Sequence, residues 1–464
     1  MTSKKKKIVI IGAGIAGLTA GALLLKKGYK VTIYEKQSTI GGRALSIDGS
    51  TVSYESYKKA LQDNNCFISF STPDLNTIFK NNLLKDYTLD LGYHAIGGGV
   101  FSNLNEILKF FDESLHFLES YVGMIYEDHY DFPFLSRIDK LKIMPNILRL
   151  LFASEKTLKH LDTIPITETI QKYGKGKMKH ILEVFSRTIT TVNNLDRIST
   201  GEMFRSQRNL YRGSKPVGYP IGGLESIHEK LQEIILSLGG EIMLNSPVEK
   251  IIIKENKATH IQINGERIAA DMVIYSGLLQ QFFTIADSNE FPKEYVTMIS
   301  SLTGTGSLCA YYSLNKIPSE LIGKTFHFIE RDVGVDGNDV VGMVDFMSAS
   351  PEANISPKNA FLIQSYAICT PEEAKDKLLL ERLKGILDKN LMRLIPDYPD
   401  MMNFVLYPSV WHLDGVAKTI DNQKPSIKTP IHNLFFIGDG VKATGIGFNC
   451  ALNSAKKLID TYVE

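Results

Sequence analysis

The sequence predicts an α/β fold in which a dinucleotide-binding domain is combined with a second, mixed α+β domain. The first observation is an apolar run over residues 8–11 that leads into a glycine-rich turn and a helical pattern of small residues. The second is another strand-like run, residues 31–34, that ends in an acid. The third is a strand-like run over residues 433–437, which is followed by a second glycine-rich turn and helix. Strand, glycine turn and helix in this order are typical of nucleotide-binding units.

Each glycine of the first turn has its own physical reason. Gly12 allows the chain to turn tightly, Gly14 lets the backbone approach a pyrophosphate, and Gly17 lets the helix pack closely against the strand. The helix begins at Ile15 and Ala16. The first N–H groups of a helix lack helical partners and lie at the positive end of its dipole. We therefore expect a pyrophosphate at this helix N-terminus.

The residues after the second strand indicate what else the site holds. Glu35 lies roughly 20 residues past the glycines, where a carboxylate binds ribose hydroxyls; a surface glutamate is the simpler alternative. We expect Lys36, the next residue, in the same site. Gly42 and Arg43 follow in a second turn and place a guanidinium near the same phosphates.

The strand and glycine turn near the C-terminus predict where a second part of the ligand binds. The buried strand ends at Gly438 and Asp439, and a glycine turn leads to Gly447 and a helix that starts at Phe448. This helix start can face a phosphate or a ring system. Two such elements at opposite ends of the chain suggest one extended ligand, with adenosine and pyrophosphate at the first turn and a ribityl chain and flavin ring at the second.

The composition indicates a globular protein and excludes several classes. A formal net charge of +1 gives no electrostatic basis for nucleic-acid binding. No apolar run approaches the ~20 residues of a membrane span. The basic N-terminal run resembles a secretory signal, but the apolar part after it is the nucleotide-binding strand, so we expect a cytoplasmic protein. The four cysteines lack metal-ligand spacing, so we expect neither a metal site nor disulfides.

Four segments together carry a resemblance to a known superfamily. They are GAGIAGLTAG…YEKQSTIGGRA, GYPIGGLESI (residues 218–227), ADMVIYSG (270–277) and FFIGDGVKATGIGFNCALNSAKKL (435–458). On these motifs the chain resembles the FAD-dependent amine-oxidase and phytoene-desaturase superfamily. The segment 218–227 is more similar to the phytoene desaturase-like branch than to the amine oxidases.

The resemblance implies a division of the chain. A Rossmann-like FAD-binding domain of the discontinuous GR2 type would comprise residues 1–99, 216–300 and 403–464, and a substrate-binding domain with a helical insert would comprise 101–212 and 301–402. The periodicity of 101–212 favours helices. Residues 46–87 form an extra polar stretch that departs from the superfamily pattern; a lid, an interface arm and a variable decoration are the alternatives.

The resemblance also assigns roles to single residues. The backbone of Val248 would face the adenine, and Asp439 would accept hydrogen bonds from ribityl or pyrophosphate-linked hydroxyls, a helix-capping role being the alternative. N–H groups around Gly447 and Phe448 would stabilise negative charge on the flavin. FAD would be bound non-covalently, because no cysteine occupies the usual tethering position. No side chain stands out as an acid or base; His94 is a weak catalytic candidate, with a structural role as the alternative.

Three functions remain open at this level. The first is desaturation or saturation of C–C bonds in an apolar isoprenoid or carotenoid-like substrate by hydride transfer at flavin N5. The second is amine oxidation with O2, and the third is a flavin-binding protein without catalysis. The segment 143–153 fits either a buried helix, which we favour, or peripheral contact with a membrane. The substrate, the redox direction, the electron acceptor and the oligomeric state are not determined by the sequence.

Overall fold

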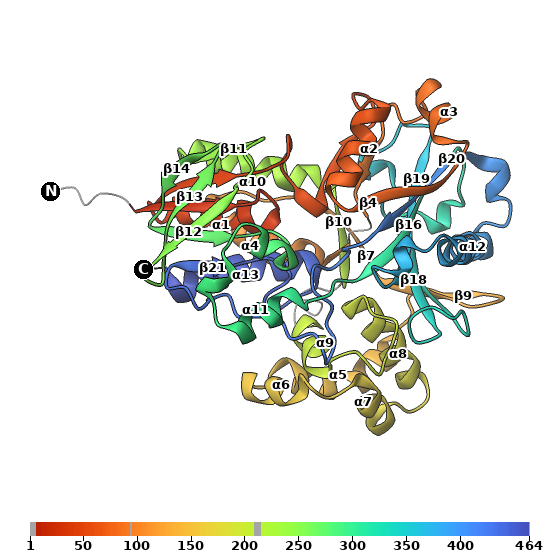
Figure 1. Cartoon of the computed structure of the whole chain (residues 1–464). Helices are drawn as coiled ribbons and strands as arrows, with labels where there is room; N and C mark the ends of the chain where they lie inside the picture. The colour runs from red at the N-terminus through yellow and green to blue at the C-terminus, as the bar shows by residue number, and fades with distance from the viewer. Residues whose placement is uncertain (1–5, 93–94, 208–214, 464) are drawn as a thin grey trace.

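Five parallel strands from three separate parts of the chain form the first sheet of the computed structural model, which describes residues 6–92, 95–207 and 215–463 (Figure 1). Neighbouring strands pair in parallel throughout. In spatial order they are β11 (Glu241–Met243), β2 (Lys30–Tyr34), β1 (Lys7–Ile11), β15 (Met272–Tyr275) and β21 (Leu434–Phe436). The predicted α/β fold with a Rossmann-like domain is confirmed.

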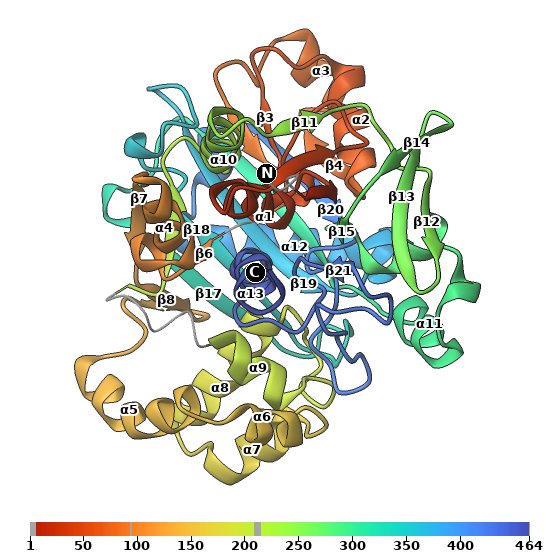
Figure 2. The same ribbon diagram turned by 90° about the vertical axis from the view of Figure 1, so that its left-hand side faces the viewer.

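Helices from both ends of the chain cover this sheet. The N-terminal helix α1 (Ile15–Lys26) is buried over nearly its whole length and packs on α13 (Gly447–Tyr462) and α10 (Glu225–Ser237). Figure 2 shows α1 and α13 next to one another. A helix that is apolar all round is stable only when it is covered, so the fold of the N-terminal unit depends on the last helix of the chain. An antiparallel sheet and two short helices complete this half: β12 (Lys250–Lys254), β13 (Lys257–Ile263), β14 (Glu266–Ala269), α4 (Asn103–Leu108) and α11 (Lys293–Ser300).

The second half is built on an eight-stranded mixed sheet. Its two long central strands are buried except at Phe361, and α12 (Lys377–Leu394) packs against one face. All described pairings are antiparallel except that of β8 with β17. The spatial order is β4 (Cys66–Thr72), β20 (Met402–Val410), β16 (Gly306–Leu314), β19 (Phe361–Cys369), β18 (Val340–Asp345), β17 (Thr325–Glu330), β8 (Val122–Ile125) and β9 (Tyr130–Asp131).

A helical lobe extends from the eight-stranded sheet and occupies the bottom of Figures 1 and 2. Its helix α8 contacts β17 and β18, and α9 contacts α6 and α8. The lobe has a small apolar core of its own. It consists of α5 (Arg137–Leu151), α6 (Glu155–Leu161), α7 (Ile166–Tyr173), α8 (Lys177–Thr190) and α9 (Thr200–Gln207).

The polar stretch 46–87 has a structural role that the sequence left open. It folds into β3 (Ser46–Asp48), α2 (Tyr54–Asp63), β4 and α3 (Leu75–Lys80), and β4 pairs with β20 at the edge of the eight-stranded sheet. β4 and, apart from Met402, β20 lie within ranges that we expected in the FAD-binding domain, 1–99 and 403–464. Strand pairing instead joins residues 66–72 and 402–410 to the sheet of the second domain.

The helical expectation for residues 101–212 needs correction in one part. After α4 the chain forms the strands β7 (Phe117–Ser120) and β8, because β7 pairs with β10 (Val217–Pro220) and β8 pairs with β17. Pairing with distant strands here overrides the local helical period. In the segment 143–153, the apolar side chains of Met144, Leu148 and Phe152 are exposed, so at least this face of the helix is not part of a buried core. Across the described residues, no helix combines the length and apolar character that spanning a bilayer requires.

Gly17 provides a test of the packing between α1 and β1. A Cβ atom at this position would lie 2.0 Å from the carbonyl oxygen of Gly12, a backbone atom that cannot move aside. We expect Gly17→Ala to lower the free energy of unfolding by about 1–3 kcal/mol, as overpacking does. The shift of the urea unfolding midpoint measures the effect.

Gly385 supplies the matched control. It lies in the interior of α12, and nothing lies within 4 Å of a Cβ atom built there. Gly385→Ala is expected to raise the unfolding midpoint, because alanine favours helix over glycine by up to about 1 kcal/mol. An unchanged midpoint in Gly17→Ala would show that the α1–β1 contact is less tight than described.

Candidate active site

One cavity of about 420 Å³ connects the two halves of the molecule. It extends from the carboxyl ends of the parallel strands, where ligands bind in open α/β sheets, to the face of the eight-stranded sheet. All cofactor-binding residues that the sequence predicts line it, except Gly17: they are Gly12, Gly14, Ile15, Ala16, Glu35, Lys36, Gly42, Arg43, Val248, Gly438, Asp439, Gly447 and Phe448. Gly17 packs beneath the turn instead. His94 lies outside the described residues.

The glycine turn before α1 leaves its helix N-terminus open toward the cavity. Gly12 has a φ of 103°, a left-handed conformation that favours glycine. Gly14 is the N-cap residue of α1, no side chain caps this end, and the first turn holds no acidic residue. The second turn lies against the first, since the N–H of Gly41 donates to the carbonyl of Ala13 at 2.9 Å. The two turns together form a backbone cradle suited to an anion.

Glu35 holds this cradle to the end of β2. Its carboxylate is nearly buried and accepts hydrogen bonds from the N–H groups of Ala13 at 2.7 Å and Gln37 at 3.0 Å. Sequence reasoning did not anticipate this structural role. Each carboxylate oxygen keeps a further lone pair, so the ribose role stays a prediction beside the observed one.

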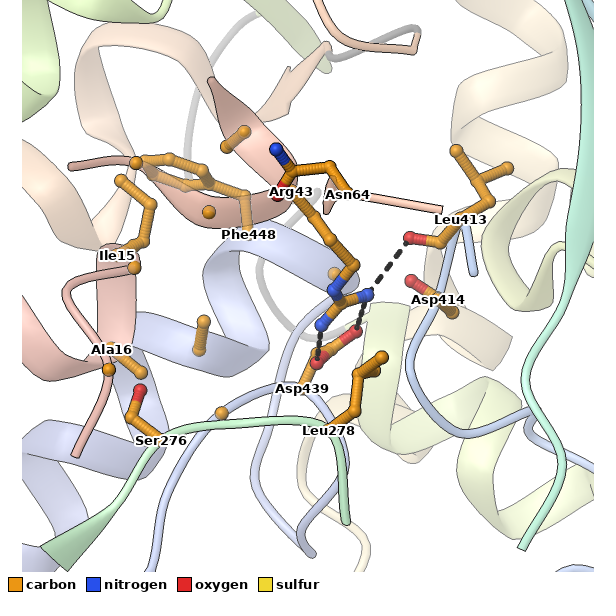
Figure 3. A pocket seen from close by; sticks show the side chains of 18 of the residues that line it. Ile15, Ala16, Arg43, Asn64, Ser276, Leu278, Leu413, Asp414, Asp439 and Phe448 are labelled. Atoms are coloured by element: carbon orange, nitrogen blue, oxygen red, sulfur yellow. Dashed lines mark hydrogen bonds and ion pairs between the residues drawn. The ribbon is translucent and has the colours of Figure 1, made fainter. Parts of the chain in front are cut away.

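Arg43 and Asp439 both line the cavity, and they form an ion pair with each other. Both terminal guanidinium nitrogens donate to the carboxylate, at 2.5 and 3.0 Å, and Arg43 also donates to the carbonyls of His412 at 3.2 Å and Leu413 at 3.4 Å. Figure 3 shows the bonds to Asp439 and Leu413. The N–H of Gly415 donates to the same carboxylate at 2.7 Å. The sequence predicted that Arg43 faces phosphates and Asp439 faces hydroxyls; in the structure they bind each other, 396 residues apart in sequence.

The pKa of Asp439 reflects this partnership. Burial alone raises the pKa of a carboxyl, but the Arg43 guanidinium reverses the effect and holds the pKa of Asp439 below its ordinary value. A carboxyl with a lowered pKa stabilises the fold at pH values above its unfolded pKa, and this contribution is lost as the pH falls toward the folded value. The ion pair therefore persists at neutral pH.

The start of α13 opens on the same cavity from the other side. Its N-cap is Ile446, no side chain caps it, and its first turn holds no acidic residue. Gly447 has a φ of 36°, and both Gly447 and Phe448 line the cavity. Figure 3 places Phe448 next to Ile15 of α1 and across the cavity from Asp439. The two helix N-termini predicted from opposite ends of the chain thus meet at one site.

Sequence reasoning missed the part of the cavity that lies against the eight-stranded sheet. There Phe185 from α8 and side chains from four strands form the wall, and they are mostly apolar. No sequence motif identifies these residues, because they come from distant parts of the chain and only the register of the paired strands brings them together. The strand-derived residues are Val122, His327, Met343 and Tyr366.

A buried charged pair beside the cavity was also missed. Asp414 lines the cavity, and its carboxylate accepts from the ammonium of Lys418 and from the hydroxyl of Thr191 at 3.2 Å. Both charged side chains are almost fully buried. Asp90, in contrast, does not line the cavity; it accepts hydrogen bonds from Ser46 and Tyr219 within the core.

The residues present fit an extended dinucleotide. Two uncapped helix N-termini face one cavity, and a Cβ atom at Gly14 would have only the carbonyl of Gly41 nearby, at 3.9 Å, which leaves room on the cavity side. Among the described residues no group of side chains could hold a metal ion. The site therefore suits an anionic organic ligand with two ends.

Relatives of this chain include carotenoid enzymes. Phytoene desaturase from Fusarium fujikuroi is 26% identical over 337 residues, which cover 69% of this chain and 57% of the relative. 4,4'-Diapolycopen-4-al dehydrogenase from Metabacillus indicus is 24% identical over 341 residues, which cover 67% of this chain and 62% of the relative. The chain thus spans less than two thirds of the length of these relatives.

The fold and family also have known counterparts. The solved structure of an oxidoreductase from Methanosarcina mazei matches with a TM-score of 0.70 at 20% identity, over 98% of this chain and 100% of the other. The family model described as flavin containing amine oxidoreductase matches residues 15–457. FAD as the cofactor and oxidoreductase as the class of protein follow from this match. The chain belongs to the flavin-containing amine oxidoreductase family.

Proposed function

We propose that this chain desaturates or saturates C–C bonds in an apolar isoprenoid or carotenoid-like substrate, with FAD as its redox cofactor. The observation that carries the proposal is the wall of the cavity at the eight-stranded sheet. The described residues that the sheet and α8 contribute to this wall include no carboxylate. An amine substrate would bring an ammonium group that needs such a partner when it is desolvated, whereas a hydrocarbon needs only apolar contact.

The similarity to relatives named as carotenoid enzymes supports the same substrate class. We also propose that FAD is bound non-covalently. None of the four cysteines lines the cavity, and all four are buried. The nearest in sequence to the α13 start is Cys450, whose thiol contacts the backbone carbonyls of Asp439 and Ala443, and burial raises its pKa. A buried neutral thiol is a poor nucleophile.

FAD, when bound, supplies the hydride chemistry at its flavin ring. The chain's own contribution is position and electrostatics. The N–H groups at Gly447 and Phe448 lie at the positive end of α13, where they favour negative charge. The ion pair of Arg43 with Asp439 links the second glycine turn to the glycine-rich segment that precedes α13. Phe185, Met343 and their neighbours exclude water and align an apolar chain by contact.

We further propose that α5 makes peripheral contact with a membrane that supplies the substrate. Ile138 and Leu141 are 65% and 73% exposed, and Leu148 and Phe152 extend the same stripe at helical spacing. The helix sequence carries four cationic residues and one acidic residue. An apolar stripe on a cationic helix complements a bilayer with anionic headgroups.

The cofactor proposal predicts a yellow protein that releases intact FAD on acid treatment. Gly14→Val should abolish FAD binding, because its side chain fills the cradle while the backbone, with a φ of −77°, tolerates valine. Glu35→Ala should weaken binding less, by about 1.5–3 kcal/mol. Titration of the apoprotein with FAD measures both, with the exposed Glu266→Ala as control. Flavin that stays on the denatured chain would contradict non-covalent binding.

The substrate proposal predicts that a polyene or prenyl lipid in detergent changes the redox state of the bound flavin. Phe185→Asp should raise the KM for the lipid at least about tenfold, since a charge in an apolar wall is desolvated at high cost. Phe185 is only partly buried, so the fold should tolerate the change. Rapid flavin reduction by a soluble amine with release of hydrogen peroxide, and no response to lipids, would favour the amine-oxidase alternative.

The membrane proposal predicts co-sedimentation with phosphatidylserine-containing liposomes that weakens at high salt. Leu141→Ser should reduce binding severalfold. Leu378→Ser in α12 is the matched control, because Leu378 is 74% exposed and lies on another helix. If both variants lose liposome binding equally, or if the protein dimerises through α5 and does not bind liposomes, the exposed stripe of α5 does not bind a bilayer.

A further inference from the structure

One polar atom in the apolar wall of the cavity lacks a partner. His327 lies on β17, lines the cavity and is only 3% exposed. Its Nδ1 atom is buried and has no hydrogen-bond partner among the described residues. A buried polar atom that is left unpaired destabilises a protein by about 1–3 kcal/mol. Because His327 lines the ligand cavity, a bound ligand is a candidate partner for this side chain.

Strand register fixes the direction of the His327 side chain. His327 pairs with Met124 on β8 and with Met343 on β18, and Met343 pairs with Tyr366 on β19. Residues directly opposite each other share one face of a sheet, and His327, Met343 and Tyr366 all line the cavity. The ring of Phe185 meets the imidazole edge-on, with 5.7 Å between centroids. The imidazole of His327 is thus part of a wall whose other sheet residues are apolar or aromatic.

The other polar side chains near this wall already have partners. The hydroxyl of Thr188 donates to the carbonyl of Val184 at 3.0 Å, and that of Thr191 is bound to the carbonyl of Thr190 and to Asp414. Tyr366 also has an interaction within the protein. Of the cavity-lining residues that the structure describes, His327 is the one with a buried, unpartnered side-chain polar atom.

The imidazole is neutral at physiological pH. Burial lowers the pKa of His327 to about 4, while a hydrogen bond with the backbone of Gly342 opposes the shift. A neutral imidazole has one donor and one acceptor nitrogen. The hydrogen bond with Gly342 raises the pKa, so an imidazole N–H donates it; because Nδ1 has no partner, the donor is Nε2 and Nδ1 is the acceptor nitrogen. A hydroxyl can donate to this acceptor.

We propose that His327 is a specificity-determining residue, whose Nδ1 binds a hydroxyl group carried by an otherwise apolar substrate. The inference rests on the proposed function, because it requires an apolar molecule in this cavity. It adds that the substrate is an oxygenated isoprenoid rather than a pure hydrocarbon. The remaining wall, including Phe185 and Met343, contacts the hydrocarbon part.

The test compares farnesol and geranylgeraniol with the hydrocarbons of the same carbon skeletons. Binding to the FAD-loaded protein in detergent is followed by the change in the visible flavin spectrum, which needs no turnover. We expect wild type to bind the alcohols about five- to tenfold more tightly. His327→Leu should bind alcohol and hydrocarbon equally and keep the wild-type affinity for the hydrocarbon within about twofold. His327→Asn, which keeps a polar atom near the position of Nδ1, should retain part of the preference.

Met343→Leu is the matched control. It changes the neighbouring side chain on the same face of the sheet without removing a polar atom, so it should leave the preference for alcohols unchanged. Without ligand, His327→Leu should also raise the melting temperature, because it removes the unpartnered nitrogen.

Several results would overturn the inference. Wild type that binds both ligand series equally, or His327→Leu that weakens both equally, would mean that His327 only packs. A lower melting temperature in His327→Leu would mean that Nδ1 has a partner inside the protein. Failure of the proposed function gives a different result, in which neither alcohol nor hydrocarbon perturbs the flavin while a soluble amine does.

Discussion

The ion pair of Arg43 with Asp439 is the contact on which the arrangement of the site depends. It joins the second glycine turn to the strand end that precedes α13, and its carboxylate also fixes Gly415. A buried ion pair is stable only when its remaining hydrogen bonds are made, and here the carbonyl of His412 and the N–H of Gly415 make them. Because the pair is formed within the protein, the helix N-termini of α1 and α13 are held at one cavity by the fold itself.

Local motifs explain why so much of the cofactor end could be predicted. Gly12, Gly14 and Glu35 fall within one strand–helix–strand unit, where the sequence carries both the geometry and its reason. The partnership of Arg43 with Asp439 could not be read in the same way. Both residues line the cavity, but only the folded chain shows that they neutralise one another.

The eight-stranded sheet was the hardest part to predict, for a physical reason. β4 comes from a polar stretch and β20 from the C-terminal third, and their pairing leaves no local signal in either segment. The strand β7 has a helical period that its partner β10 overrides. The row that includes His327 and Met343 depends on register, and a shift by one residue would turn both side chains away from the cavity.

The packing of α1 against α13 has a consequence for how the protein is made. The strand β1 and the apolar helix α1 are synthesised well before their neighbours β15, β21 and α13, which lie far along the sequence. Until α13 leaves the ribosome, α1 therefore exposes apolar surface, a condition that invites aggregation or chaperone binding. A chain that ends before α13 lacks one of the two helix N-termini that face the cavity. Tight binding of the dinucleotide therefore requires that α13 has been made.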